Sequence, residues 1–408
     1  MQQPPRQAEV VAIGSELLLG QIVDTNSAVI ARHFAGMGLN LFYKTTVGDN
    51  LGRVTEVLRQ ALSRSDVVVT TGGIGPTADD ITREAVAAAT ERALVFSEHL
   101  MRQIETFFAS RGFRLSPSNR RQAYVPAGAI PIENPVGTAP AFIVEHEGRT
   151  VITLPGVPRE MEYLLTRRVL PWLRERYAIQ GEIRLRILKA VGLGESRIGE
   201  LIADFMETGG NPTVGTLAHL GQVDVRIAAK GETAAEAERL IAPVEAEIRG
   251  RLGDAVFGAD EATLEGEITR RLTALDARLA LVEIGSAGAA AERLAAGLPE
   301  RFAGGLVVAD AAALQAFGLA VPGGDLGSDR ARALAEAVAR RAGTRVGAAA
   351  WLEPVVGSAP PVVAAAVGVA LDGRSEARDW RLGGDPPSVR IRAATLLLDH
   401  VRRALPPA

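Results

Sequence analysis

Residues 67–82 hold the feature that most constrains the fold, because a short apolar run leads directly into a glycine-rich, acidic turn. Val67–Val69 have the composition of a buried strand, and TTGGIGPTADDIT follows at 70–82. Glycines let a backbone approach a ligand closely and turn its N–H groups toward it. A helix beginning after the turn adds partial positive charge, which favours phosphate. The segment predicts a strand–turn–helix unit of an α/β protein with a phosphorylated ligand at the turn.

Two adjacent carboxylates, Asp79 and Asp80, stand at the end of this turn. Carboxylates of this kind can hold a divalent cation beside a phosphate. The alternative is that one of them only caps the following helix, a position that aspartate often takes. Two aspartates together with three glycines exceed what capping requires, so we favour a ligand site. Its expected backbone donors are Gly72, Gly73 and Gly75.

The first 172 residues alternate strand-like and helix-like segments, which predicts a mostly parallel α/β sheet. Three strands end in glycine turns, at Gly14, Gly72-Gly73 and Gly156. In open α/β sheets, ligands bind outside the carboxyl ends of the strands. We therefore expect one site built from the three turns. Strands are expected at 9–13, 67–69, 141–145 and 150–154, helices at 25–37, 51–62, 81–93 and 97–110, and a long surface loop at 115–140.

Two further domains are expected, since 408 residues exceed one typical domain. Residues 173–258 contain polar–apolar alternation typical of half-buried antiparallel strands, which predicts a small α+β module. Residues 259–408 are rich in alanine and alternate strands with helices, which predicts a second α/β domain. In the module we expect strands at 182–188 and 222–229 and helices at 196–206 and 234–252. In the last domain we expect helices at 261–275, 287–297, 329–342 and 387–405, and strands at 279–284, 305–309, 345–350 and 362–371.

Composition excludes several classes of function. The chain has no cysteine, which rules out disulfides, thiolate nucleophiles and cysteine-based metal sites. Its net charge is −3 and it has no tract of five Lys or Arg, so direct nucleic-acid binding is disfavoured. The first residues lack an apolar signal core, and no apolar run reaches about 18 residues. We therefore expect a cytoplasmic protein without a membrane association.

Three other segments carry candidate site residues. Glu16 and Asp24 follow the first strand and would add to the anion and metal site, although Asp24 has the alternative role of helix cap. The sequences NPVGTA at 134–139 and LPGVPREM at 154–161 are, taken alone, ordinary turns.

Together these segments resemble the CinA family, named for competence and damage induction. IGSELLLG at 13–20, DTN at 24–26, the turn at 70–82, NPVGTA and LPGVPREM are similar to that family's motifs. The resemblance covers about 170 residues densely. It continues through GLGES at 192–196 and NPTVG at 211–215, in a KH-like module. It implies a MoaB/MogA-like (molybdopterin-binding-like) three-layer first domain.

The resemblance further implies that this domain hydrolyses the pyrophosphate bond of ADP-ribose or a related nucleotide, using a divalent cation, with a monovalent cation as an open option. A homodimer is implied as well, and a recombination-protein partner is conceivable. The implied catalytic residues are Asp24, Asp79 and Asp80, and the implied metal ligands are Glu16, Asp79 and Asp80. The implied substrate-binding residues are Gly14, Glu16, Asn26, Gly72, Gly73, Gly75, Thr77, Asn134, Gly137, Thr138, Ala139, Pro155, Gly156 and Glu160.

The last domain departs from the family, in which it is a nicotinamide mononucleotide deamidase with a serine after its first strand. Ile284 occupies the serine's place and has no group that can attack an amide. Ser286 lies two positions further on and is better explained as a helix cap. We expect a deamidase-like fold, 259–408, without deamidase activity; residual activity is the less favoured alternative. A different class of function is a binding scaffold, in which the first domain holds a nucleotide or pterin without chemistry.

Overall fold

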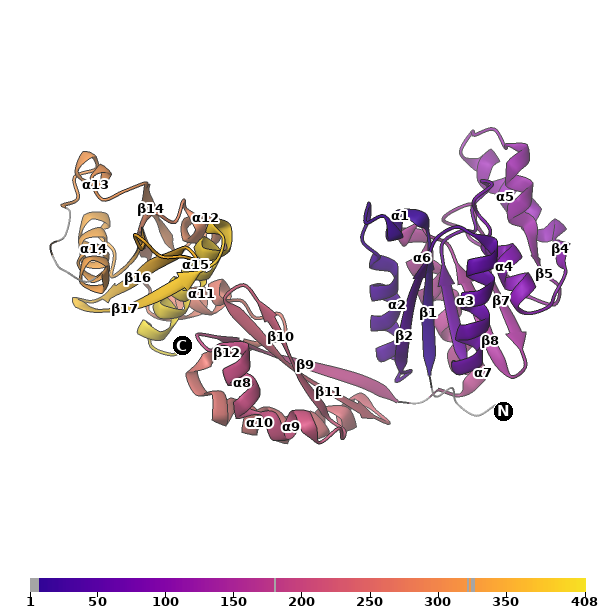
Figure 1. The fold of residues 1–408 in the computed structure, drawn as a ribbon, viewed down its shortest axis with the longest axis horizontal. Helices are drawn as coiled ribbons and strands as arrows, with labels where there is room; N and C mark the ends of the chain where they lie inside the picture. The colour runs from indigo at the N-terminus through magenta and orange to yellow at the C-terminus, as the bar shows by residue number, and fades with distance from the viewer. Residues whose placement is uncertain (1–6, 180, 321–322, 324–326) are drawn as a thin grey trace. The chain divides into compact units, whose positions relative to one another are not determined.

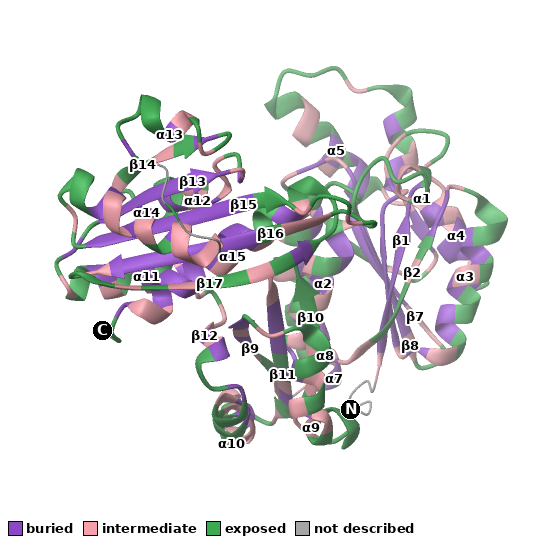
Figure 2. Cartoon of the chain, turned by 60° about the vertical axis from the view of Figure 1, so that its left-hand side comes forward, coloured by how far each residue is buried: buried purple, intermediate pink, exposed green. Residues whose placement is uncertain are grey.

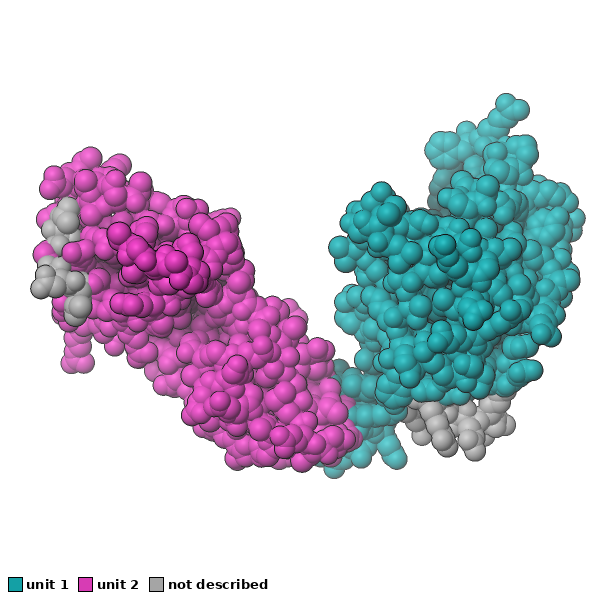
Figure 3. Space-filling model, in the orientation of Figure 1, with its two compact units in different colours: residues 1–184, 230–239 teal, residues 185–229, 240–408 magenta. Residues whose placement is uncertain are grey.

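The computed structural model describes residues 7–179, 181–320, 323 and 327–408, so the first six residues of the predicted N-terminal domain lie outside it. The chain divides into two compact units (Figure 3). One unit comprises residues 1–184 and 230–239, and the other comprises 185–229 and 240–408. The expected division at 172 and 258 into three domains stays a prediction.

The first sheet has six strands in the order β2-β1-β3-β8-β7-β6. Strand β1 lies parallel to β2 and β3, and β3 lies parallel to β8, whereas β7 runs antiparallel to β8 and β6. This confirms the predicted α/β class with a mostly parallel core. The strands are β1 Ala8–Ile13, β2 Leu41–Val47, β3 Val67–Thr71, β6 Ile130–Ile132, β7 Ala141–His146 and β8 Arg149–Leu154.

Helices cover both faces of this sheet, because the buried strands are apolar on both sides. On β1, Val10 packs against one helical layer and its neighbour Val11 against the other, and both are fully buried. Complete burial of a side chain such as Phe34 in the first layer contributes about 2–3 kcal/mol. Figures 1 and 2 show the layers and their buried strands. One layer contains α2 Thr25–Ala35, α6 Pro158–Leu164 and α7 Leu170–Tyr177; the other contains α3 Leu51–Arg64, α4 Thr82–Ala89 and α5 Glu98–Ser110.

The predicted surface loop at 115–140 is wrong in part. It contains a 3₁₀ helix, η1 (Pro117–Ala123), which begins with proline and is closed by a capping box between Ser116 and Asn119. Strand β5 (Tyr124–Pro126) follows and pairs with β4 (Leu94–Phe96), and β6 joins the main sheet. Elements this short leave no periodicity to recognise.

Most other predicted elements are present with shifted ends. Helix α4 stops at Ala89 rather than 93, since Glu91 has a φ of 54° that a helix cannot include. The helix expected at 196–206 is broken at Ile202 into α8 (Glu195–Leu201) and α9 (Ala203–Glu207). The second sheet has the order β10-β11-β9-β12, of which β10 and β12 were not predicted. Its strands are β9 Glu182–Val191, β10 Thr213–His219, β11 Gln222–Gly231 and β12 Val256–Ala259, accompanied by α10 Ala234–Leu252.

The third sheet has the order β14-β13-β15-β16-β17. Helix α14 packs directly on it, because Gly347 and Gly368 have no side chain: a Cβ there would lie 2.0 Å from Ala335 O and 2.4 Å from Ala331 O. Strand β17 was not predicted, since half of its residues are charged. The elements are β13 Leu279–Ile284, β14 Phe302–Val308, β15 Val346–Pro354, β16 Val362–Leu371 and β17 Arg374–Gly383, with α11 Leu264–Ala274, α12 Ala289–Gly297, α13 Ala313–Ala316, α14 Gly327–Ala342 and α15 Pro386–Ala404.

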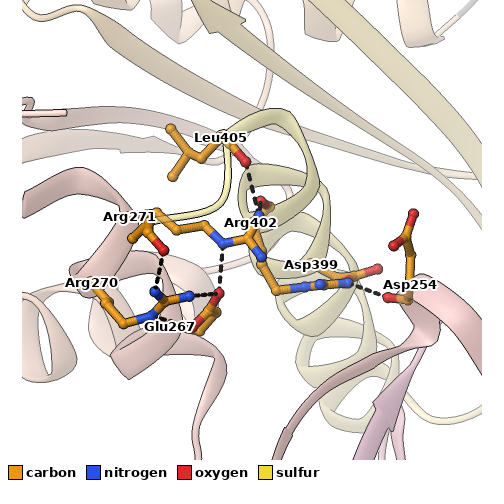
Figure 4. Close-up of polar contacts among 8 residues, drawn as sticks. Asp254, Glu267, Arg270, Arg271, Asp399, Arg402 and Leu405 are labelled. Carbon is orange, nitrogen blue, oxygen red and sulfur yellow. Dashed lines mark hydrogen bonds and ion pairs between the residues drawn. The ribbon is translucent and has the colours of Figure 1, made fainter. Parts of the chain in front are cut away.

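The buried Arg402 and the partly buried Arg271 secure the end of α15 (Figure 4). The last carbonyls of a helix lack partners within it. Arg271 of α11 donates to the carbonyls of Arg402 and Leu405 at 2.8 and 2.9 Å. Arg402 in turn donates to Asp399 and, at 2.6 Å, to the carbonyl of Asp254. These contacts explain why charged residues occur in the core of this unit.

Candidate functional site

A cavity of about 430 Å³ lies at the carboxyl ends of strands β1, β3 and β8. This is the expected position, because β2 and β3 flank β1 on opposite sides and so create a switch point. Three of the predicted residues, Thr77, Asn134 and Gly137, do not line it. The predicted residues in its wall are Gly14, Glu16, Asp24, Asn26, Gly72, Gly73, Gly75, Asp79, Asp80, Thr138, Ala139, Pro155, Gly156 and Glu160.

The carboxylate of Asp80 holds the glycine-rich turn together. Its Oδ1 accepts a hydrogen bond of 2.7 Å from the Gly75 amide. Its Oδ2 accepts from the amide and the hydroxyl of Thr77 at 2.8 and 2.6 Å. Both oxygens are therefore engaged inside the turn, a structural task that the sequence did not indicate. The catalytic and metal-binding roles of Asp80 and the substrate role of Thr77 stay predictions.

The backbone donors of the turn differ from those expected. The Gly72 amide donates to Leu154 O at 3.1 Å, and the Gly75 amide donates to Asp80. Of the three predicted donors, only Gly73 keeps an amide without a partner among the described residues. Gly72 has a φ of 103°, and a Cβ on it would lie 2.2 Å from Ile13 O. Glycine is thus required there so that the turn can cross the end of β1.

Two arginines that the sequence analysis did not identify support the turn. Arg83, only 2% exposed, donates to the carbonyls of Ile74 and Gly75. Burial lowers the pKa of Arg83 to about 10, so the side chain is still charged at neutral pH. Arg121, from η1, donates to Thr77 O at 2.6 Å and to Glu84 at 3.1 Å. The region expected to be a loop therefore contributes to the turn's position.

Asp24 acts as the cap of α2, the alternative considered for it. Its carboxylate accepts from the amide and the hydroxyl of Ser27 at 2.9 and 2.5 Å, and Lys44 lies 3.2 Å away. Burial by itself would raise the pKa of Asp24, but the hydrogen bonds from Ser27 and the charge of Lys44 hold it below its usual value. Asp24 is therefore an ionised, already paired carboxylate, and its catalytic role stays a prediction.

Asn26 connects two walls of the cavity. Its amide nitrogen donates to Thr71 Oγ1 at 2.9 Å and to Gly156 O at 2.8 Å. Its Oδ1 is buried and has no hydrogen-bond partner among the described residues. Buried polar atoms are nearly always satisfied, so this oxygen is a candidate acceptor for a ligand.

Asn134 and Gly137 form the support for Glu160, which lies in the first turn of α6. The buried Asn134 amide donates to Ala139 O at 3.0 Å and to Glu160 Oε2 at 2.6 Å. A Cβ on Gly137 would lie 1.9 Å from the same Oε2. Burial raises the pKa of Glu160, and the hydrogen bond from Asn134 offsets this only in part. Asn134 and Gly137, both predicted to bind substrate, thus contact the carboxylate of Glu160 and do not themselves line the cavity.

The charge of the cavity wall is entirely acidic. Six carboxylates line it and no Lys, Arg or His does. Asp49, missed in the sequence analysis, accepts the Ser15 amide at 2.7 Å, and Gln122, also missed, donates to Thr138 at 3.2 Å. The six are Glu16, Asp24, Asp49, Asp79, Asp80 and Glu160.

An oxygen-only donor set suits a hard divalent cation. Among the described residues, however, no three Asp, Glu, His or Cys side chains converge as a metal cage. Asp79 is exposed, and its hydrogen bond from Thr77 and the charge of Arg121 lower its pKa. The carboxylate of Glu16 has no hydrogen-bond or ion-pair partner within the described part of the chain. The donors fit a cation that takes its other ligands from water and a phosphate, which is how Mg²⁺ is usually held.

The last domain has a cavity of about 740 Å³ at the corresponding strand ends, with a mainly apolar wall. Ile284 ends β13 and is 2% exposed. Ser286 is buried, and its hydroxyl donates to Glu283, which also accepts the amides of Ala290 and Ala291 at the start of α12. The expectation that Ser286 caps the helix is wrong, because the N-cap of α12 is Gly288 and the helix amides donate to Glu283 instead. The hydroxyl of Ser286 is committed to Glu283, and Ser286 does not line the cavity.

Comparison with known proteins agrees with this architecture. Residues 9–175 match the family model of a probable molybdopterin binding domain, and residues 178–258 match the KH domain of damage-inducible protein CinA. The first domain is therefore MoaB/MogA-like.

Similarity extends along the chain. It is 36% identical over 410 residues to a CinA-like protein of Dictyoglomus thermophilum, covering 98% of this chain and 99% of that one. It is 34% identical over 412 residues to a CinA-like protein of Kosmotoga olearia, with the same coverages. A CinA crystal structure from Thermoplasma acidophilum is 38% identical and covers 41% of this chain and 99% of that one, with a TM-score of 0.39. The chain belongs to the CinA family.

Among the helices of the described residues, none combines the length and apolar composition needed to cross a bilayer.

Proposed function

We propose that the first domain hydrolyses the diphosphate bond of ADP-ribose or a closely related nucleotide with the help of a divalent cation. The acidic wall carries this proposal: a diphosphate would be repelled by six carboxylates with no basic side chain among them. A cation between ligand and wall converts that repulsion into attraction. The volume of about 430 Å³ lies within the range of small-molecule sites.

The chain's own groups have distinct tasks in this proposal. Asp79 and Glu16 would hold the cation, since Asp24 and Asp80 already have protein partners. The Gly73 amide would donate to a phosphate oxygen, and Asn26 Oδ1 would accept from a ribose hydroxyl. When bound, the cation supplies charge neutralisation and Lewis-acid polarisation of the phosphoryl group.

Product analysis on the full chain tests the proposal. Purified protein is offered ADP-ribose with Mg²⁺, Mn²⁺ or Co²⁺ in turn, and AMP and ribose 5-phosphate are separated by chromatography. We expect both products in equal amounts, and none with excess chelator. Asp79→Asn should weaken activation by the metal, partly reversed at high metal concentration. Glu105→Gln, a charge loss on an exposed position of α5, is the control. Binding of ADP-ribose without AMP release under every metal would overturn the hydrolytic proposal.

The second candidate is a non-catalytic scaffold that binds a nucleotide or a pterin. Two observations favour it: the match of 9–175 to a molybdopterin-binding model, and a last domain without a nucleophile at Ile284. Titration calorimetry with ADP-ribose separates the two candidates, because a scaffold gives a binding isotherm with no continuing reaction heat.

A further inference from the structure

We propose that Glu160 is the general base of the first domain and takes the proton of the attacking water on its Oε1. This inference rests on the proposed hydrolysis and names the residue that would activate the nucleophile. Glu160 lies in the cavity wall, in the first turn of the helix that follows β8.

The position of its carboxylate is fixed from one side only. Oε2 accepts the 2.6 Å hydrogen bond from Asn134, whose amide is itself held by Ala139 O. Oε1 has no hydrogen-bond or ion-pair partner among the described residues. One oxygen is thus anchored and the other is available, the arrangement that an oriented base needs.

The backbone at Gly137 indicates that space is reserved for this carboxylate. Gly137 does not have a left-handed φ, so its conformation does not itself require glycine. A Cβ there would lie 1.9 Å from Oε2 and 2.0 Å from the carboxyl carbon of Glu160. Any larger residue would displace Glu160.

The other five carboxylates of the cavity are less suited to act as the general base. Asp80 accepts three hydrogen bonds within its turn. Asp24 is paired with Ser27 and Lys44. Asp49 also has one bound oxygen, but its donor is the exposed Ser15 amide, whereas the donor to Glu160 is the buried Asn134. The two left are Asp79, exposed beside Arg121, and Glu16, whose carboxylate accepts no hydrogen bond from the described residues.

The basicity expected of the Glu160 carboxylate agrees with its position. Burial raises the pKa of Glu160, and the hydrogen bond from Asn134 offsets this only in part. A raised pKa makes a carboxylate a better proton acceptor near neutral pH. No Lys, Arg or His side chain of the cavity wall opposes this effect.

The proposed hydrolysis forms one bond to phosphorus and breaks another. The water oxygen forms a bond to one phosphorus of the diphosphate, and the bond from that phosphorus to the bridging oxygen breaks. The bridging oxygen leaves with the electron pair as part of the second phosphate. Oε1 of Glu160 receives the water proton and later releases it to solvent. ADP-ribose and water thus give AMP and ribose 5-phosphate.

The first test is Glu160→Gln, which keeps the size of the side chain and an oxygen for Asn134. We expect kcat to fall about 10²–10⁴-fold, the usual contribution of a general base. KM and the metal concentration for half activation should change less than about threefold, since Glu160 here acts on the attacking water and not in the substrate-binding role that the family resemblance implies. The acidic limb of the pH profile of kcat should disappear. Glu162→Gln, an exposed charge loss on the same helix, should behave as wild type.

The second test is a double-mutant cycle with Gly137→Ala. Alone, this change should lower kcat by displacing the carboxylate. In a Glu160→Ala background, the carboxylate that the new methyl group would meet is absent. Gly137→Ala should then have no further effect on kcat or on melting temperature.

Active wild-type protein together with a Glu160→Gln variant of normal kcat and unchanged pH profile would overturn the assignment of Glu160. If Glu160→Gln changed only the metal concentration needed for half activation, Glu160 would be a metal ligand, and its assignment as the general base would be overturned as well. Wild-type protein that releases no AMP would instead overturn the proposed hydrolysis.

Discussion

The backbone amide of Gly75 donates a 2.7 Å hydrogen bond to the carboxylate of Asp80, five residues further along the chain. Since Thr77 donates twice to the same carboxylate, the turn facing the cavity is closed by one of its own acidic side chains. Asp80 thus determines the shape of the wall whether or not it takes part in chemistry.

Asp80→Ala should therefore lower stability as well as activity, in contrast to a purely catalytic residue. Two backbone amides and a hydroxyl lose a charged acceptor, and we expect a loss of about 2 kcal/mol in the free energy of unfolding. Asp80→Asn, which keeps one acceptor for Gly75, should lose about half as much. Urea unfolding measures both. A wild-type midpoint for Asp80→Ala would show that the hydrogen bonds of the turn contribute nothing.

Arg83→Met should disorder the glycine-rich turn, because the buried Arg83 side chain holds two of the turn's carbonyls. The substitution leaves the carbonyls of Ile74 and Gly75 without their donor, at a cost of about 2–4 kcal/mol. We expect a lower unfolding midpoint and a raised KM for ADP-ribose. Arg102→Met, on the exposed face of α5, is the matched control. Equal midpoints for the two variants would contradict the supporting role of Arg83.

Glu160→Gln should raise thermal stability at neutral pH. Burial raises the pKa of Glu160 despite the hydrogen bond from Asn134, so the native state binds its proton more tightly than the unfolded chain does. Stability is then lost as pH rises from the ordinary glutamate pKa of 4.5 to the higher native value. The variant, which does not titrate, escapes this loss. Melting temperatures measured across pH should differ most at neutral pH and converge below 4.5; a constant difference would argue against a raised pKa.

The last domain should release no ammonia from nicotinamide mononucleotide. Ile284 has no nucleophilic atom, and the Ser286 hydroxyl is bound to Glu283. An enzyme-coupled ammonia assay on the full chain should stay at the blank value, and Ser286→Ala should change only stability, by about 1 kcal/mol. Ammonia release that disappears in Ser286→Ala would make Ser286 a nucleophile after all.

Much of the fold was predictable because it depends on local pattern. The apolar run at 67–69 and the glycines after it identify a buried strand and its turn, and strands β13 and β16 were predicted with the bounds that the structure has. Short or polar elements escaped: η1 lies in a Pro- and Gly-containing segment, and β17 is an edge strand with charged side chains. They are stabilised by pairing and packing with neighbouring elements, β17 with β16 and η1 with α5, which a pattern within the element itself does not show.

By itself, the sequence indicated most of the glycines and carboxylates that gather at the cavity, since parallel strands of one sheet bring their carboxyl ends to one edge; it missed Asp49 and Gln122. It also determined that the last domain lacks the expected nucleophile. Only the tertiary structure decided what each carboxylate does. Asp80 closes its turn, Asp24 caps a helix, and Glu160 has one oxygen anchored by the buried Asn134 and one that has no protein partner among the described residues. A carboxylate's role follows from its hydrogen bonds and burial. The hydrogen bonds of Asp80 and Asp24 come from residues of their own turns, and that of Glu160 comes from Asn134 in another segment, so only the folded geometry decides among them.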